Sequence, residues 1–157
     1  MSSQHINHLT QHFKEFHSGV NWTWANLKET LSDITYLEAI HQFSTLNTIV
    51  GLTYHIHYYY ITAIKVLQGG PVEGSDKYSF DHPEIKSEAD WEDLQKMIFA
   101  QADLFITLLS QLEENKLWET FGEEKYGDYY RNIVGTLEHS HYHLGQIVVL
   151  KKLIRSQ

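Results

Sequence analysis

The segment 139–146 reads HSHYHLGQ and places three histidines at alternate positions. Neutral imidazole is the commonest metal ligand in proteins, so the chemistry that this segment could support is metal binding. In a β-strand all three side chains would share one face, whereas in a helix only residues three or four apart do so. The secondary structure of this segment therefore decides which histidines can act together.

Residues 128–154 are predicted to be a helix because their apolar side chains recur every three or four positions. In this helix His139 and His143 lie one turn apart on the same inward face. Such a pair is half of a binding site for a divalent metal ion. His141 points to the opposite side and is interpreted as a surface histidine.

A third ligand must come from another helix, and residues 44–67 are the best candidate because their apolar residues also recur at helical spacing. This helix carries His55 and His57, which point in different directions because they are two residues apart. His55 lies near mid-helix and shares a face with Leu52 and Tyr59. The pattern slightly favours His55 and leaves both histidines open.

Two other polar side chains are candidates for contacts with the ligands. Gln146 lies about one turn beyond His143 and could orient a ligand or the substrate, but it could equally make a buried polar contact between helices. Residues 58–60 are three tyrosines that cover three directions, so at least one should face the site or a partner. Tyr59, on the face of His55, is the candidate. No carboxylate is placed as an obvious general base.

The whole chain of 157 residues is expected to form one domain, residues 1–157. The absence of cysteine excludes disulfides, thiolate metal sites and cysteine nucleophiles. A formal charge of −8 without a basic segment argues against a nucleic-acid partner. No signal peptide is recognised, and polar residues interrupt the longest apolar segment. We therefore expect a cytoplasmic protein that does not bind membranes.

An all-α fold is predicted because both prolines lie in one glycine-containing stretch, residues 69–84, which reads as a long loop. Four helices are expected, and the first of them is interrupted near Gly19: residues 4–31, 44–67, 87–112 and 128–154. Four helices with a long connection between the second and the third predict a four-helix bundle. The alternative for the second segment is a strand, which its length disfavours.

Local signals mark several predicted helix ends. Thr35 and Glu38 form a capping-box pattern, Gly69 is a C-terminal glycine, and Ser87 is an N-cap. The remaining histidines are interpreted as surface or loop residues: His5, His8, His12, His17, His41 and His82. The four tryptophans are interpreted as core or loop-packing residues: Trp22, Trp24, Trp91 and Trp118.

The histidine pattern resembles the DinB-like superfamily of metalloproteins. Its members carry a mid-bundle histidine in the second helix, matched here by His55 in TYHIHYYY, and a last-helix motif matched by His139, His143 and Gln146. The blocks DKYSFD (76–81) and EKYGDYYRN (124–132) are also similar to one subgroup. The resemblance covers nearly the whole chain.

This resemblance implies an up-down-down-up four-helix bundle, often a homodimer, with a divalent metal held by His55, His139 and His143. Zn²⁺ and Ni²⁺ are the expected metals. Three neutral imidazoles leave coordination positions on such an ion open for water or substrate. Members with known activity include transferases and isomerases that use a low-molecular-weight thiol on a small-molecule substrate. The alternatives are a metal-dependent hydrolase and a non-catalytic dimeric bundle that binds a ligand.

Overall fold

The long proline-free segments of the chain are helical, as expected. The computed structural model describes residues 4–157, which form six α-helices and three 3₁₀ helices without a β-strand, so the all-α prediction is confirmed. Their bounds are α1 Gln4–Ser18, α2 Leu27–Leu31, α3 Tyr36–Ile40, α4 Ile49–Leu67, η1 Asp76–Tyr78, α5 Glu88–Ser110, η2 Glu114–Trp118, η3 Glu124–Tyr126 and α6 Tyr129–Arg155. No helix within residues 4–157 combines the length and the apolar character needed to cross a membrane.

The predicted capping signals are present. The Thr35 side chain and Glu38 form both halves of a capping box at the start of α3. The Ser87 side chain accepts a hydrogen bond from the Asp90 backbone N–H at the start of α5. Gly69 has a φ of 85°, the left-handed conformation that ends α4. These helix ends are therefore encoded locally in the sequence.

One predicted helix start is wrong. The segment 44–67 becomes helical only from Ile49, because the Thr48 side chain caps α4 by accepting from the Gly51 N–H. Leu46, which falls within the predicted helix 44–67, lies in the turn before α4 and is exposed. The interrupted segment 4–31 is two helices, and the break after Ser18 falls at the predicted position.

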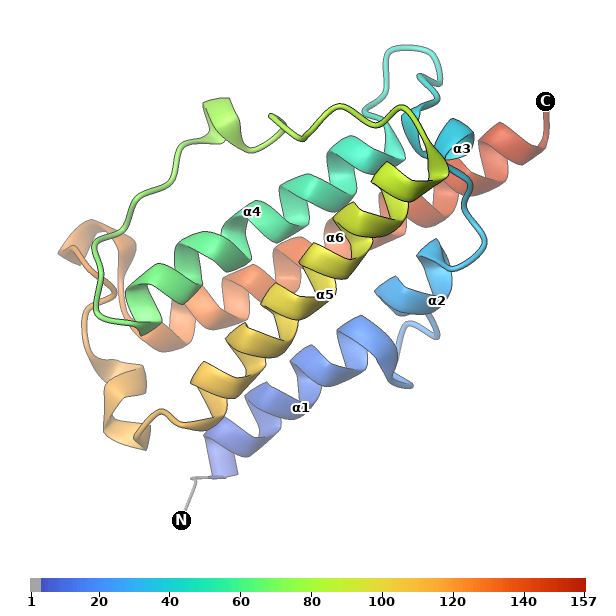
Figure 1. The fold of residues 1–157 in the computed structure, drawn as a ribbon. Helices are drawn as coiled ribbons and strands as arrows, with labels where there is room; N and C mark the ends of the chain where they lie inside the picture. Colours follow the sequence, from blue (N-terminus) through green and yellow to red (C-terminus); the bar gives the residue numbers. More distant parts are fainter. Residues whose placement is uncertain (1–3) are drawn as a thin grey trace.

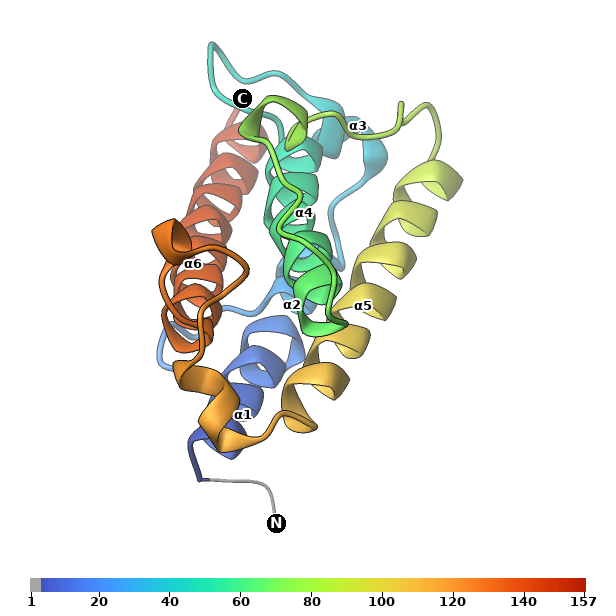
Figure 2. The same ribbon diagram turned by 90° about the vertical axis from the view of Figure 1, so that its left-hand side faces the viewer.

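The four long helices lie side by side (Figure 1). α4 packs against α5 and α6, and α1 packs against the same two helices from the other side. α1 and α6 begin at one end of the molecule, whereas α4 and α5 begin at the other end, near the C-terminus (Figure 2). The short helices α2 and α3 cover this arrangement, α2 against α1 and α6 and α3 against α4 and α5.

The connection between α4 and α5 must return along the molecule, because α4 ends far from the point where α5 begins (Figure 1). The 19 residues of α4 span about 28 Å, which a tight turn cannot bridge. Residues 68–87, green in Figure 1, make this return along α4 and carry η1. We call this segment the crossover. Its middle is thereby brought over the middle of α4.

Aromatic side chains from three helices meet in the core. Phe13 of α1, Tyr60 of α4 and Phe105 of α5 are all buried. Their rings form edge-to-face pairs, with centroids 4.8 Å apart for Phe13 and Phe105 and 5.0 Å apart for Tyr60 and Phe105. Such pairs add directional attraction to the burial of apolar area. They fix α4 against α1 and α5.

A buried hydrogen bond aligns α4 with α6. The Ser140 hydroxyl donates to the Thr136 carbonyl oxygen at 2.7 Å, so its oxygen is free to accept from the Tyr60 hydroxyl at 3.2 Å. Tyr60 and Ser140 are both almost fully buried. An unpaired hydroxyl at this depth would be costly, so the bond specifies the register of the two helices. Ser140 directly follows His139, so this register also positions the predicted ligand.

The tryptophans were predicted to pack, but only Trp91 is buried. Its indole N–H donates to the Ile34 carbonyl oxygen at 2.8 Å. Trp22 and Trp24 are 98% and 86% exposed, so the prediction for them is wrong. The reason is the loop after α1, which closes on itself through hydrogen bonds of the Asn21 side chain and turns both indoles outward. Trp118 in η2 is also more than half exposed.

Replacing Trp91 by Phe should lower the free energy of unfolding by about 2–3 kcal/mol. The substitution leaves the buried Ile34 carbonyl oxygen without its donor and removes part of a fully buried side chain. Urea unfolding followed by circular dichroism measures this loss. The matched control is Trp22→Phe, which should change the free energy by less than about 0.5 kcal/mol because Trp22 is on the surface. Equal losses in both variants would contradict the interpretation.

Candidate metal centre

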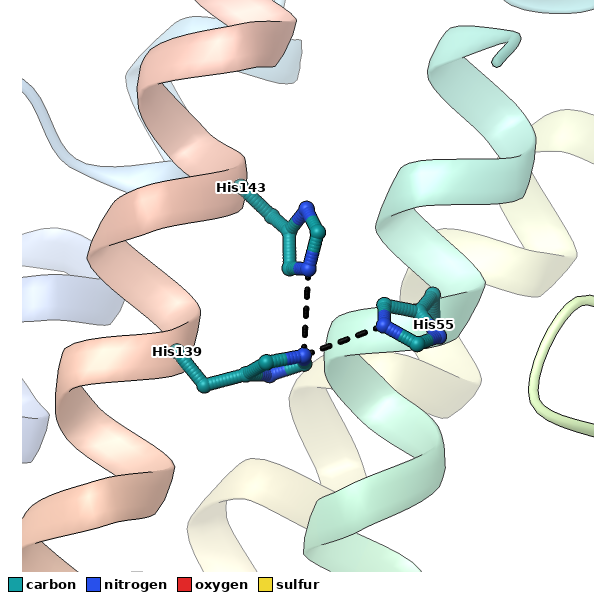
Figure 3. Close-up of side chains that lie close together, drawn as sticks. All are labelled: His55, His139 and His143. Atoms are coloured by element: carbon teal, nitrogen blue, oxygen red, sulfur yellow. Dashed lines mark hydrogen bonds between the residues drawn. The ribbon is translucent and has the colours of Figure 1, made fainter. Parts of the chain in front are cut away.

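Three histidine side chains converge between α4 and α6 (Figure 3). His139 and His143 lie one turn apart on α6, with their Nε2 atoms 3.1 Å apart. His55 reaches them from α4, and its Nε2 lies 3.0 Å from that of His139. One nitrogen from each ring lies within 4.8 Å of the others. These three histidines are close enough to bind one metal ion.

The crossover fixes the orientation of the His55 ring. The Ser79 hydroxyl donates to the Asp76 carbonyl oxygen at 2.8 Å, so its oxygen accepts from His55 Nδ1–H at 2.9 Å. A neutral imidazole with its proton on Nδ1 carries a lone pair on Nε2. Phe80 stacks flat on His55, with ring centroids 4.1 Å apart. The His55 ring is therefore held through Nδ1, and its Nε2 points toward the other two histidines.

His143 is held in the same way by its own helix. Its Nδ1 lies 2.7 Å from the amide oxygen of Gln146, which can only accept, so Nδ1 carries the proton. The Nε2 of His143 then has a free lone pair that points toward His139. Gln146 was expected either to orient a ligand or to make a polar contact between helices. Its bond to His143 corresponds to the first of these roles. Such contacts behind a ligand fix its tautomer and ring direction.

The three clustered nitrogens cannot all be satisfied by hydrogen bonds. With protons on the Nδ1 atoms of His55 and His143, the cluster holds at most the one proton that His139 can carry on Nε2. That proton can be directed at only one neighbour, so at least one contact brings two lone pairs together. A cation between the rings would turn this repulsion into bonds to three lone pairs.

The site also favours the neutral form of its histidines. Burial, followed by the charge of a protonated His143, lowers the pKa of His55. Burial, with His143 and His55, lowers the pKa of His139 to about 4. Both rings are therefore neutral at pH 7. Neutral imidazole is the form that binds metal, so no proton has to be displaced from these two rings.

A tyrosine and a carboxylate border the cluster. The Tyr59 ring lies 4.6 Å from that of His139 and 5.2 Å from that of His55, and its hydroxyl donates to the Asp76 carboxylate. Burial and this carboxylate raise the pKa of Tyr59, so the phenol stays protonated. The charge of Asp76 acts to raise the pKa of both His55 and His139. Burial has the stronger effect, so both pKa values remain lowered.

Sequence reasoning missed Ser79, Phe80 and Asp76. All three belong to the block DKYSFD, which was noted only for its resemblance to a family. Their contacts with α4 depend on where the crossover passes over the helix, and the spacing of residues along the chain does not encode this position. The local signal was the loop itself, since long ordered loops in small domains often carry functional groups.

Several clefts lie near the cluster, and two of them differ clearly in chemistry. The polar cleft, of about 450 Å³, is lined mainly by Tyr59, Lys125, Arg131, Asn132, Thr136 and His139. The apolar cleft, of about 350 Å³, is lined mainly by Leu46, Leu52, Tyr142, Gln146, Val149 and Leu150. Both volumes are of the size that small-molecule sites have. The cluster is therefore flanked by a polar and an apolar space.

The other histidines do not join the cluster. His57, the alternative to His55, lies in the interior, and its Nε2 has no hydrogen-bond partner among the described residues. His17 and His141 were predicted to be on the surface, and this is wrong. His17 is buried, and its ring N–H donates to the Phe13 carbonyl oxygen at 2.7 Å. His141 is half-buried against Phe16, because α1 covers that side of α6. Four histidines are exposed as predicted: His5, His8, His12 and His41.

The donor set fits a divalent cation. Three imidazoles on two helices, two of them oriented by a hydrogen bond at Nδ1, form the ligand pattern of zinc sites that keep a position open for chemistry. His139 is the exception, because its Nδ1 is buried without a partner among the described residues. No protein-family model, no curated protein and no solved structure matches this chain.

Replacing Ser79 by Ala should weaken binding of Zn²⁺ about 10- to 100-fold. The variant removes the acceptor that holds Nδ1 of His55, and the loss of such a partner typically has this effect. Competition with a chromogenic zinc chelator measures the affinity. The control is Ser75→Ala in the same crossover, because the Ser75 side chain makes no capping hydrogen bond. Equal affinities in both variants would show that the bond to His55 does not matter.

Acid should destabilise the fold through His17. Burial lowers its pKa from the ordinary 6.5 to about 4, so between these values the unfolded chain binds a proton that the folded chain does not. The free energy of unfolding should therefore fall as the pH is lowered from 6.5 to 4, by on the order of 3 kcal/mol for this residue.

Urea unfolding at several pH values tests this expectation. The variant His17→Leu should show a shallower dependence on pH, whereas the control His8→Gln, at an exposed position on the same helix, should leave it unchanged. A pH dependence in His17→Leu as steep as that of the wild type would assign the effect to other groups.

Proposed function

We propose that this chain is a metal-dependent enzyme in which His55, His139 and His143 hold one divalent cation. The observation that carries the proposal is the meeting of three Nε2 atoms, two of which have a lone pair fixed by a hydrogen bond at Nδ1 of the same ring. Zn²⁺ and Ni²⁺ are the metals we propose, because both suit imidazole ligands.

We further propose that the chain is a DinB-like protein with an up-down-down-up four-helix bundle. The motif that suggested this family supplies two of the clustered histidines on α6 and one on α4. The placement of the helix ends supports the topology, since α1 and α6 begin opposite α4 and α5 (Figures 1 and 2). By the same resemblance we propose a homodimer, and from the sequence pattern of the N-terminus and the longest apolar segment we propose a cytoplasmic location.

We assign a separate role in catalysis to each residue around the cluster. A divalent cation with an open position polarises a bound group and makes its oxygen or sulfur more acidic. Ser79 and Gln146 keep the ligand rings in their binding tautomers, and Phe80 covers one face of His55. Asp76, whose charge acts on His55 and His139, is the candidate to accept the proton released by a substrate.

The reaction we propose is the transfer of a low-molecular-weight thiol to a second small molecule: the sulfur forms a bond to a carbon of that molecule, the bond from this carbon to its leaving group breaks, and the thiol proton passes to Asp76. A polar and an apolar cleft on either side of the cluster can accommodate two different substrates. Hydrolysis requires only one organic substrate, so this arrangement favours transfer. A metal-dependent hydrolase is the second candidate, and a non-catalytic bundle that binds a ligand is the third.

Protein purified without a histidine tag and loaded with Zn²⁺ or Ni²⁺ should contain about one metal ion per chain. The variant His139→Ala/His143→Ala should lose this metal, because it removes two of the three ligands. The matched control is His8→Ala/His12→Ala, since these residues are also one turn apart but on the exposed face of α1. Inductively coupled plasma mass spectrometry measures the content.

Wild-type protein with far less than one metal ion per chain would contradict the proposal, as would equal losses in both double variants. The same proteins separate the reaction classes. Consumption of a thiol together with an alkylating substrate supports transfer, and cleavage of an ester without consumption of the thiol supports hydrolysis. Binding of metal and substrate without turnover of either mixture supports the non-catalytic bundle.

A further inference from the structure

The apolar cleft directly continues the two walls of the metal centre. Leu52 precedes His55 by three residues on α4, and Gln146 follows His143 by three residues on α6. The cleft therefore begins about 5 Å, one helical turn, along both helices from the ligands. The Gln146 side chain lines the cleft and also accepts the hydrogen bond from His143. The two spaces are neighbours joined by one side chain.

Gly145 is the second observation. It lies inside α6, a helix of 27 residues, where glycine costs about 1 kcal/mol relative to alanine. A Cβ atom at this position would meet no other atom within 4 Å, so packing within the chain does not require glycine. Gly145 does line the apolar cleft. Its effect on the structure is to widen this cleft beside the metal centre.

The lining indicates the chemistry of the occupant. Leu52 and Leu150 are buried at its base, and Val149, 55% exposed, and Leu46 form its open rim. Charged side chains do not contribute to this lining, and the polar ones include Gln146 at the inner end. A space of about 350 Å³ suits a short hydrocarbon chain or a single ring rather than a long lipid tail.

We propose that the apolar cleft binds the hydrocarbon part of a small substrate whose polar group lies at His55, His139 and His143. The inference rests on the proposed metal centre and adds the substrate class. The substrate carries a polar, metal-binding group next to a short aliphatic or aromatic chain. Burial of this chain in the cleft orients the polar group, because the cleft begins about one helical turn from the three histidines.

Straight-chain hydroxamic acids bound to the Zn²⁺-loaded protein test the proposal. Their head group binds metal through two oxygens, and the chain can be lengthened from acetohydroxamic to octanohydroxamic acid. Each methylene that enters the cleft should raise affinity by up to about fourfold, giving on the order of tenfold to a hundredfold before the cleft is full. Isothermal titration calorimetry measures the series.

Gly145→Phe should abolish most of this gain, because a large side chain here meets no protein atom near its Cβ and projects into the cleft. It should weaken the long probes far more than acetohydroxamic acid. Gly145→Ala is the matched control and should keep most of the gain. Val149→Glu is a second variant at an exposed position, so its folding is not at risk, and it should also reduce the gain.

The outcomes separate the inference from the proposed function. Full zinc content and binding of acetohydroxamic acid without any gain from longer chains would overturn the inference alone. Zinc far below one ion per chain would overturn the proposed function as well. Light scattering that shows a wild-type dimer and a Gly145→Phe monomer would assign the cleft to a second copy of the chain and overturn the inference.

Discussion

Each buried imidazole has two nitrogens that have lost water, and each nitrogen needs a hydrogen-bond partner or a metal in its place. His17 and His141 meet part of this need with carbonyl oxygens of their own helices. His55 and His143 use side chains for one nitrogen, and the other nitrogen of each is directed at His139. In the centre between α4 and α6, the protein groups leave this requirement unmet at nitrogens that face one another, and this explains why a cation fits there. The Nε2 of His57 also has no partner among the described residues, but His57 does not belong to this group of possible ligands.

The crossover is the part of the fold that completes this centre. Because α4 and α5 begin at the same end of the molecule, the chain has to return along α4 (Figure 1). On the way it contacts His55 through Ser79 and Phe80. Ser79 and Phe80 then hold one ligand, and Asp76 adds a carboxylate near two of them. A helix connected by a tight turn would have left His55 with solvent as its neighbour. The crossover therefore determines both the order of the helices and the surroundings of His55.

Which residues pair within a single helix could be predicted from the sequence, whereas contacts between separate segments could not. The pairing of His139 and His143 follows from the helical period, and the helix ends follow from local capping residues. His55 was only slightly preferred, because α4 is apolar on nearly every side and its pattern does not identify the side that faces α6. The burial of His17 and the exposure of Trp24 depend on the packing of α1 and the closure of a loop, which have no signature in spacing.

The ligands are also far apart along the chain, because His139 follows His55 by 84 positions. A cation that binds both closes a loop that contains α5 and the irregular residues 111–128. Closing so long a loop restricts the unfolded chain much as a covalent cross-link does, and it restricts the folded chain hardly at all. The supply of metal would then determine how long the folded protein resists heat and proteolysis, and it would also determine the catalytic activity. In a chain without cysteine, the metal centre can provide the tether that disulfides provide elsewhere.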